Sequence, residues 1–179
     1  FGAGAMGCDI SAFNCLISRV KTHAHAPASL EMELRRILED AQQRPDGDLS
    51  FASEWLANWY SPRALSELLR YRDAAADADS QVRDVANLIL CRSARSARLT
   101  THFDLDFPRH PVREPYYCHK HKRTCRPVDE AEKFLRRYSA DTAPPPEPPS
   151  ASGLVPTAVT CGMVLTHSTL VLNDLTNCM

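Results

Sequence analysis

The chain has 179 residues, of which 44% are hydrophobic, so it is long and apolar enough to bury a core as one domain. Its formal charge is −1 at pH 7, which by itself indicates no class of partner. No stretch approaches the ~18 apolar residues of a membrane span, and no secretory signal precedes the first element. We therefore expect a cytoplasmic protein without a membrane partner.

The charges are unevenly distributed along the chain. Residues 91–126 contain nine Lys and Arg against three acids, a net charge of +6, and the remaining residues sum to −7. Residues 143–179 contain neither Lys nor Arg, although the chain as a whole has 21 of them. These changes in composition predict three regions: residues 1–26, 27–142 and 143–179.

The first region has the pattern of one α/β unit. Residues 5–8 predict a short strand that ends on an acid, Asp9, and Ser11 or Asn14 can cap the next helix. The helix has an apolar face at positions spaced i, i+3, i+4 and i+7, namely Phe13, Leu16, Ile17 and Val20. An acid at the carboxyl end of a strand can accept hydrogen bonds from both hydroxyls of a ribose. The alternative is that Asp9 is an ordinary turn or capping residue, and no glycine-rich loop decides between them.

The second region is predicted to be mostly helical. Ser61-Pro62 is a typical helix start, and Asp129 with Glu132 resembles a capping box. Between the helices, residues 100–127 are rich in proline and basic residues and predict a loop. The expected helices span residues 29–43, 51–59, 62–73, 80–98 and 129–138.

The third region differs in character. Its proline-rich start, residues 143–152, cannot form a helix or a central strand and predicts a disordered linker. Residues 155–179 are apolar and rich in Thr, with weak strand character. They are either a marginal strand pair or a tail foreign to the domain, and the sudden loss of basic residues favours the second.

The basic loop holds four groups that are able to bind a metal: Cys118, His119, His121 and Cys125. Tetrahedral sites usually take two ligands from each of two separate knuckles, and these four lie within one short segment. The spacing therefore predicts no metal site and instead a structural loop with Cys118 and Cys125 buried. The zinc alternative, with Cys91 as a further ligand, remains open.

The same loop combines positive charge with aromatic rings. Tyr116 and Tyr117 lie beside the basic cluster, an arrangement that predicts phosphate contacts and base stacking. The alternative is a solvated basic face without a partner. The residues expected to contact DNA are Arg92, Arg95 and Arg98 on the preceding helix, and Lys120, Lys122, Arg123 and Arg126 in the loop.

Three segments together resemble the site-specific DNA methyltransferases that modify exocyclic amino groups (N6-adenine or N4-cytosine type). They are GAGAMGCDISAFNCLISRVKT (residues 2–22), the helical pair WYSPRALSELLRYRD and VANLILCRSARSARLTTHFDLDFPR (residues 59–73 and 85–109), and PYYCHKHKRTCRPVDEAEKFLRRYSADT (residues 115–142). The first segment is similar to the strand and helix that come after the family's Asp-Pro-Phe-x-Gly-Ser-Gly-Thr motif.

This resemblance implies a Rossmann-like α/β fold with S-adenosylmethionine as methyl donor and DNA as partner. Asp9 matches the acid that holds the cofactor ribose, and Ile10 matches the position next to the adenine. The helical region would carry target recognition. This chain itself is expected to be mostly α-helical, with one short N-terminal strand and an irregular C-terminal tail.

Two of the family's motifs are absent from the sequence. The cofactor loop would precede Phe1, and the catalytic Pro-Pro-Tyr or Pro-Pro-Phe motif would come after Thr142. No catalytic residue is therefore assigned, and we expect an internal fragment that does not methylate DNA alone. The alternative is a non-enzymatic helical nucleic-acid-binding module, with or without zinc, and a third is a helical interaction domain whose basic face is merely solvated.

Overall fold

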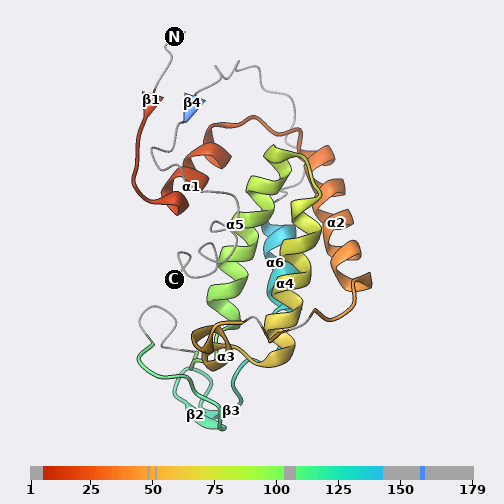
Figure 1. Ribbon diagram of the computed structural model, residues 1–179. Coiled ribbons are helices and arrows are strands. Elements are labelled where there is room, and N and C mark those ends of the chain that lie inside the picture. Colours follow the sequence, from red (N-terminus) through yellow and green to blue (C-terminus); the bar gives the residue numbers. More distant parts are fainter. Residues whose placement is uncertain (1–5, 48, 51, 103–107, 143–157, 160–179) are drawn as a thin grey trace.

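The computed structural model describes residues 6–47, 49–50, 52–102, 108–142 and 158–159. The described part is mostly helical, as predicted, and none of its helices is long and apolar enough to cross a bilayer. In chain order (Figure 1), the elements are β1 (Met6–Gly7), α1 (Ala12–Thr22), α2 (Pro27–Gln43), α3 (Glu54–Trp59), α4 (Pro62–Ala76), α5 (Ser80–Ala97), β2 (Tyr116–Cys118), β3 (Arg123–Cys125), α6 (Glu132–Thr142) and β4 (Ala158–Val159).

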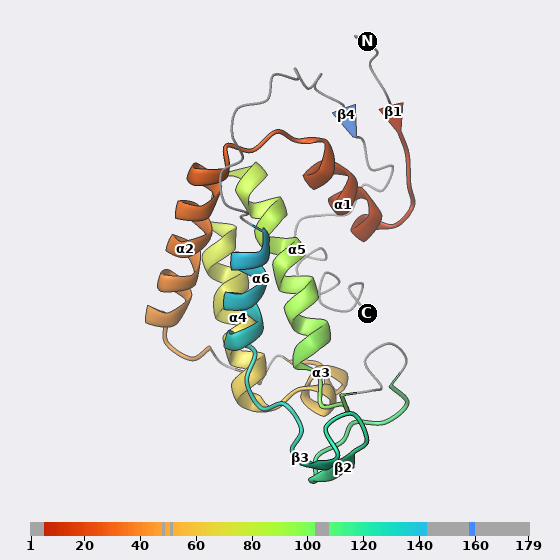
Figure 2. The ribbon, with the colours of Figure 1, turned by 180° about the vertical axis from the view of Figure 1, so that it is seen from behind.

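Four helices form a bundle. Helices α2, α4, α5 and α6 pack in a ring, in which each contacts its two neighbours, and successive helices run in opposite directions (Figures 1 and 2). Leu34, Ile37, Leu68 and Ile89 are each at most 1% exposed and belong to one continuous core. Burying an aliphatic side chain of this size stabilises a fold by about 1.5–3 kcal/mol.

The predicted cap of α1 at Ser11 and the predicted starts of α4 and α5 are confirmed, whereas α3 begins at Glu54, later than the predicted residue 51. The hydroxyls of Ser11, Ser53 and Ser61 accept hydrogen bonds from backbone N–H groups in the first turns of α1, α3 and α4. The start of α2, predicted at residue 29, is too late, because this helix begins at Pro27. Proline suits the first helical position, where its missing N–H would have no partner within the helix.

Helix α6 is capped from another helix. It begins at Glu132, so the start predicted at residue 129 is too early. The buried carboxylate of Glu67 on α4 accepts hydrogen bonds from the backbone N–H groups of Ala131 (2.6 Å) and Glu132 (2.9 Å). A carboxylate at this place also interacts favourably with the positive end of the helix dipole. Glu67 therefore joins α4 to the segment from which α6 begins.

The N-terminal strand pairs with a strand from the third region. β1 lies parallel to β4, with Met6 opposite Ala158 and Gly7 opposite Val159. The first strand was predicted over residues 5–8, and the described strand covers two of them. Residues 158 and 159 belong to the segment for which the sequence left open a marginal strand pair or a foreign tail, and they form a strand. Residues 143–157 and 160–179 lie outside the described part, as does residue 5.

Helix α1 is tied to the bundle by an ion pair. The guanidinium of Arg19 donates two hydrogen bonds to the carboxylate of Asp84 on α5, at 2.6 and 2.9 Å. Such two-point contacts fix orientation as well as distance. Helix α1 is thereby held beside α5, and β1 lies on the side of α1 that faces away from α5 (Figure 1).

The predicted basic loop contains an antiparallel hairpin. β2 and β3 pair with Tyr116 opposite Cys125 and Cys118 opposite Arg123, so residues 119–122 form the turn. Lys122 at the end of this turn has a φ of 51°, the left-handed conformation common at the end of four-residue hairpin turns. The hairpin lies next to α3 at the end of the bundle opposite α1 (Figures 1 and 2).

Candidate nucleic-acid interface

The hairpin carries an uninterrupted group of positive charges. Lys120, Lys122, Arg123 and Arg126 are all exposed, and residues 115–128 contain no acid. The turn brings the side chains of Lys120, Lys122 and Arg123 to the tip of the hairpin, where they remain in contact with water. We call this group of four the hairpin cations. The structure thus places all four of the predicted loop contacts on one exposed element.

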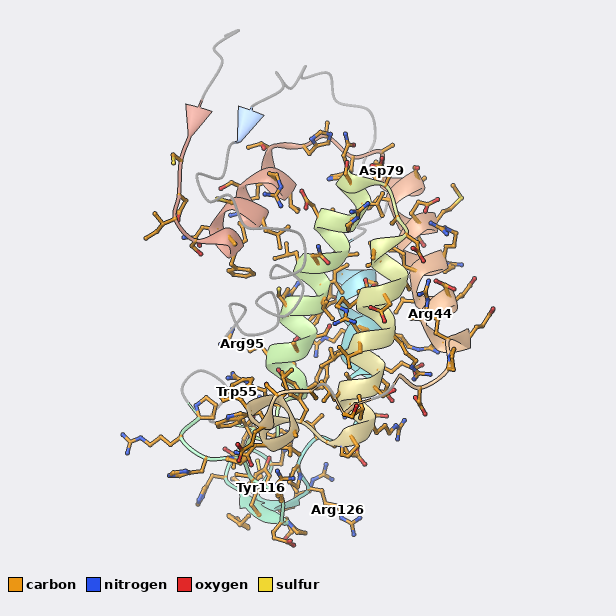
Figure 3. All side chains as sticks on the ribbon, viewed as in Figure 1. Arg44, Trp55, Asp79, Arg95, Tyr116 and Arg126 are labelled. Atoms are coloured by element: carbon orange, nitrogen blue, oxygen red, sulfur yellow. The ribbon has the colours of Figure 1, made fainter. Side chains whose placement is uncertain are left out.

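The three predicted arginines of α5 have different surroundings. The guanidinium of Arg92 lies 4.1 Å from the centre of the Tyr138 ring, a cation–π contact with α6. Arg95 is exposed in the last turn of the helix, at the same end of the molecule as the hairpin (Figure 3). Arg98 is only 6% exposed, and its Nε donates to the carbonyl of Arg95. The structure therefore brings Arg95, but not Arg98, to the surface near the hairpin.

Aromatic rings accompany these charges. Tyr117 is 56% exposed and meets the ring of His119 edge-on, whereas the hydroxyl of Tyr116 accepts a hydrogen bond from the backbone N–H of His102. Of the two tyrosines predicted to stack, Tyr117 is the more available. Trp55 on α3 is 40% exposed at the same end (Figure 3) and was not singled out from the sequence. The sequence indicated Trp55 only as a large aromatic residue in the short helix before Ser61.

Two cysteine sulfurs and one imidazole of the hairpin lie close to the imidazole of a residue that precedes the hairpin. One ligand atom from each of His102, Cys118, His121 and Cys125 lies within 4.8 Å of those of the other three. The Nδ1 atom of His121 is 3.6 Å from the Cys118 sulfur and 3.4 Å from the Cys125 sulfur, and His102 Nδ1 is 3.6 Å from the Cys118 sulfur. We call these four residues the Cys/His cluster.

The composition of this cluster differs from the one weighed from the sequence. His102 takes the place considered for His119, and Cys91 is buried on α5 outside the cluster. His102 was missed because it precedes Cys118 by many residues and only the fold brings the two together. Burial, followed by the electrostatic influence of His121 and of nearby cations such as Lys120, lowers the pKa of His102. The imidazole of His102 is therefore biased toward its neutral form.

The predicted ribose-binding acid, Asp9, lies at the start of α1. Its Oδ1 accepts a hydrogen bond from the backbone N–H of Ser11 (2.7 Å), and its Oδ2 accepts one from the amide of Asn14 (3.1 Å). The hydrogen bond from Ser11, followed by that from Asn14, lowers the pKa of Asp9. These contacts are those of an ordinary turn residue, the alternative left open by the sequence. The neighbouring Ile10 side chain is 90% exposed.

A comparison with known proteins places this geometry in context. Over 113 residues, 62% of its length, the chain is 41% identical to the type II methyltransferase M.MjaII of Methanocaldococcus jannaschii. The resemblance to the DNA methyltransferases is confirmed. The chain spans 21% of the length of this relative. No model of a protein family matches the chain, and no solved structure does.

Proposed function

We propose that this chain is part of an S-adenosylmethionine-dependent DNA methyltransferase that modifies an exocyclic amino group of a base. The observation that carries the proposal is the 41% identity with the methyltransferase M.MjaII over 113 residues. In this proposal the helical bundle and its hairpin contact DNA, and the unit formed by β1, β4 and α1 belongs to a Rossmann-like cofactor domain.

The hairpin cations support the DNA contact. Four positive side chains are exposed on a segment that contains no acid, and their charge is complementary to that of a phosphate backbone. Arg95 extends this charge onto α5, and Tyr117 and Trp55 offer exposed rings at the same end. Phosphate contacts of this kind position a protein on DNA, whereas base contacts provide sequence specificity. We therefore assign the hairpin to positioning.

Asp9 and Ile10 would hold the cofactor. Asp9 accepts hydrogen bonds from Ser11 and Asn14 within the turn. A carboxylate offers about four lone-pair positions to donors such as the hydroxyls of a ribose. A carboxyl group of this type is anionic at neutral pH, and the hydrogen bonds from Ser11 and Asn14 lower its pKa further. The exposed Ile10 side chain offers an apolar contact for an adenine. S-adenosylmethionine itself would supply the methyl group.

DNA binding can be measured by the fluorescence anisotropy of a labelled duplex at several salt concentrations. The triple variant Lys120→Gln, Lys122→Gln and Arg123→Gln should weaken binding and reduce the slope of log K against log salt by roughly 0.9 for each phosphate that is no longer neutralised. The control removes the same charge from exposed arginines elsewhere, Arg35→Gln, Arg36→Gln and Arg137→Gln. Equal effects in the two variants, or an affinity independent of salt, would contradict the DNA-contact proposal.

Cofactor binding can be measured by titrating the chain with S-adenosylmethionine in a calorimeter. Asp9→Asn should raise the Kd by about tenfold or more, because the ribose hydroxyls no longer meet a charged acceptor. The exposed Asp141→Asn serves as the control and should leave the Kd unchanged. Salt-dependent DNA binding without any binding of S-adenosylmethionine would instead favour a non-enzymatic nucleic-acid-binding module.

A further inference from the structure

We propose that the Cys/His cluster is a structural zinc site that fastens the hairpin to the end of α5. Its ligands are the Nδ1 atoms of His102 and His121 and the sulfurs of Cys118 and Cys125. The inference rests on the geometry of these four residues and does not depend on the proposed methyltransferase function.

Three sulfur–nitrogen distances match the edges of a zinc tetrahedron. With Zn–S bonds of about 2.3 Å and Zn–N bonds of about 2.0–2.1 Å, tetrahedral angles place a sulfur and a nitrogen ligand about 3.6 Å apart. The three measured sulfur–nitrogen distances are 3.4, 3.6 and 3.6 Å. All four ligand atoms also lie within 4.8 Å of one another. The longest separation exceeds a tetrahedral edge, so at least one ligand would move inward when a cation binds at the centre of the cluster.

Hydrogen bonds alone explain the cluster less well. The Nδ1 atom of an imidazole has one in-plane position, where it either accepts or donates a single hydrogen bond. For His121 two sulfurs, those of Cys118 and Cys125, compete for that position at 3.6 and 3.4 Å. A central cation removes this competition because it occupies the one position of His121 Nδ1 and binds both sulfurs directly.

The hairpin also lacks an apolar core of its own. Within residues 108–130, Cys118 and Cys125 are the buried residues, and their paired strands have three residues each. A two-stranded hairpin is at best marginally stable in water, and small units without a core are commonly held by a structural metal. The two buried side chains here are therefore ligands rather than aliphatic residues.

The fourth ligand connects the hairpin to the bundle. His102 closely follows Leu99, whose backbone N–H donates to the carbonyl of Trp59 and whose carbonyl accepts from the N–H of Val112. These bonds fix the segment that leaves α5. Zinc bound to His102 and to three hairpin residues would thus join two separately positioned segments.

The ligand set indicates a structural role. Two thiolates and two imidazoles complete a four-coordinate shell, which leaves no position for a substrate or a water molecule. Soft sulfur with imidazole favours Zn²⁺ over Mg²⁺ or Ca²⁺, which prefer oxygen. When Zn²⁺ binds, the thiols of Cys118 and Cys125 each lose a proton to solvent, so the two positive charges of the metal are balanced by two thiolates.

The test uses the full chain purified after expression with zinc and dialysed against metal-free buffer. Mass spectrometry of the metal content should give one zinc per chain, and Cys118→Ser or His102→Gln should reduce this value by about fivefold or more. His119→Gln is the matched control, because His119 lies in the same turn but outside the cluster, and it should retain one zinc.

Cobalt(II) provides a second measurement that does not require loss-of-ligand variants to fold. The metal-free wild-type chain should bind one Co²⁺ with the strong visible absorption of tetrahedral coordination and a sulfur-to-metal charge-transfer band. His121→Cys should still bind one Co²⁺. Its charge-transfer absorption should rise about 1.5-fold over that of the wild type, because the site then has three thiolates instead of two. Wild-type chain with less than about 0.2 zinc per chain, octahedral Co²⁺ spectra, or equal reductions for His119→Gln and His102→Gln would overturn the proposal.

Discussion

The bundle and the hairpin differ in what holds them together. Helices α2, α4, α5 and α6 share one core of aliphatic and aromatic side chains, whereas residues 108–130 bury two cysteines. The bundle therefore derives its stability from the removal of apolar surface from water. For the hairpin, the corresponding interaction is a convergence of sulfur and nitrogen atoms.

This difference shows how a segment can present charge at its surface and still keep a fixed shape. The hairpin cations occupy positions that would otherwise be available for apolar side chains, and their like charges repel one another. A compact set of polar ligands needs only a few residues to hold such a segment. The two regions should accordingly respond to different perturbations.

The largest expected effect is that of metal removal on the hairpin. Apparent binding free energies of structural zinc in small peptides are about 10–16 kcal/mol at pH 7, so a chelator should unfold the hairpin completely. Trypsin should then cleave quickly after Lys120, Lys122 and Arg123, while the helical signal in circular dichroism changes little. Loss of most helical signal on chelation would show that the bundle depends on the hairpin.

A cavity in the core tests the other half of the comparison. Leu68 is fully buried on α4, and Leu68→Ala should reduce the free energy of unfolding by about 2–5 kcal/mol. Urea unfolding followed by circular dichroism measures this change. The zinc content without urea should remain one per chain. As the control, Met32→Ala changes an exposed side chain on α2 and should alter stability by less than about 0.5 kcal/mol.

A smaller effect is expected where the two regions meet. Glu67→Ala removes the acceptor of the Ala131 and Glu132 N–H groups and should reduce stability by about 1.5–3 kcal/mol. Hydrogen exchange should accelerate first at the start of α6. If exchange accelerates uniformly over the bundle instead, Glu67 does not act as a local cap.

The smallest effect concerns α1. Arg19→Lys keeps the charge opposite Asp84 but loses the two-point geometry. The pair is partly exposed, with 40% of the Arg19 side chain accessible, so we expect a loss of about 0.2–1 kcal/mol after solvent screening. Urea unfolding can detect the upper part of this range, and a loss above roughly 2 kcal/mol would mean that α1 is integral to the bundle.

Local signals in the sequence were sufficient to predict most of the helices. Ser61-Pro62 and the apolar spacing after Ser11 both mark helices that the structure confirms. The start of α6 was not predictable in the same way, because its cap comes from Glu67, which is distant in sequence. Asp129 and Glu132 have the spacing of a capping box, but spacing alone does not show which group reaches the helix end.

The candidate site was predictable only in part for the same reason. The charge of Lys120 and its neighbours is visible in the sequence, and exposure is the usual consequence of charge. The membership of His102 in the Cys/His cluster depends on the path of the chain between α5 and β2, which no local pattern specifies. Burial of Arg98 likewise results from packing at the end of α5 rather than from its own residue type.

The long connection between α5 and α6 has a consequence for the unfolded chain. Residues 98–131 link two neighbouring helices of the ring, and β2 and β3 contribute three residues each to this connection. Connections longer than about 12–15 residues without secondary structure of their own are uncommon in compact domains. Ligands at positions 102, 118, 121 and 125 would divide this connection into short closed loops. With a metal bound, the chain would close several short loops instead of one long loop. Each short loop loses less conformational entropy on closure than the long loop does.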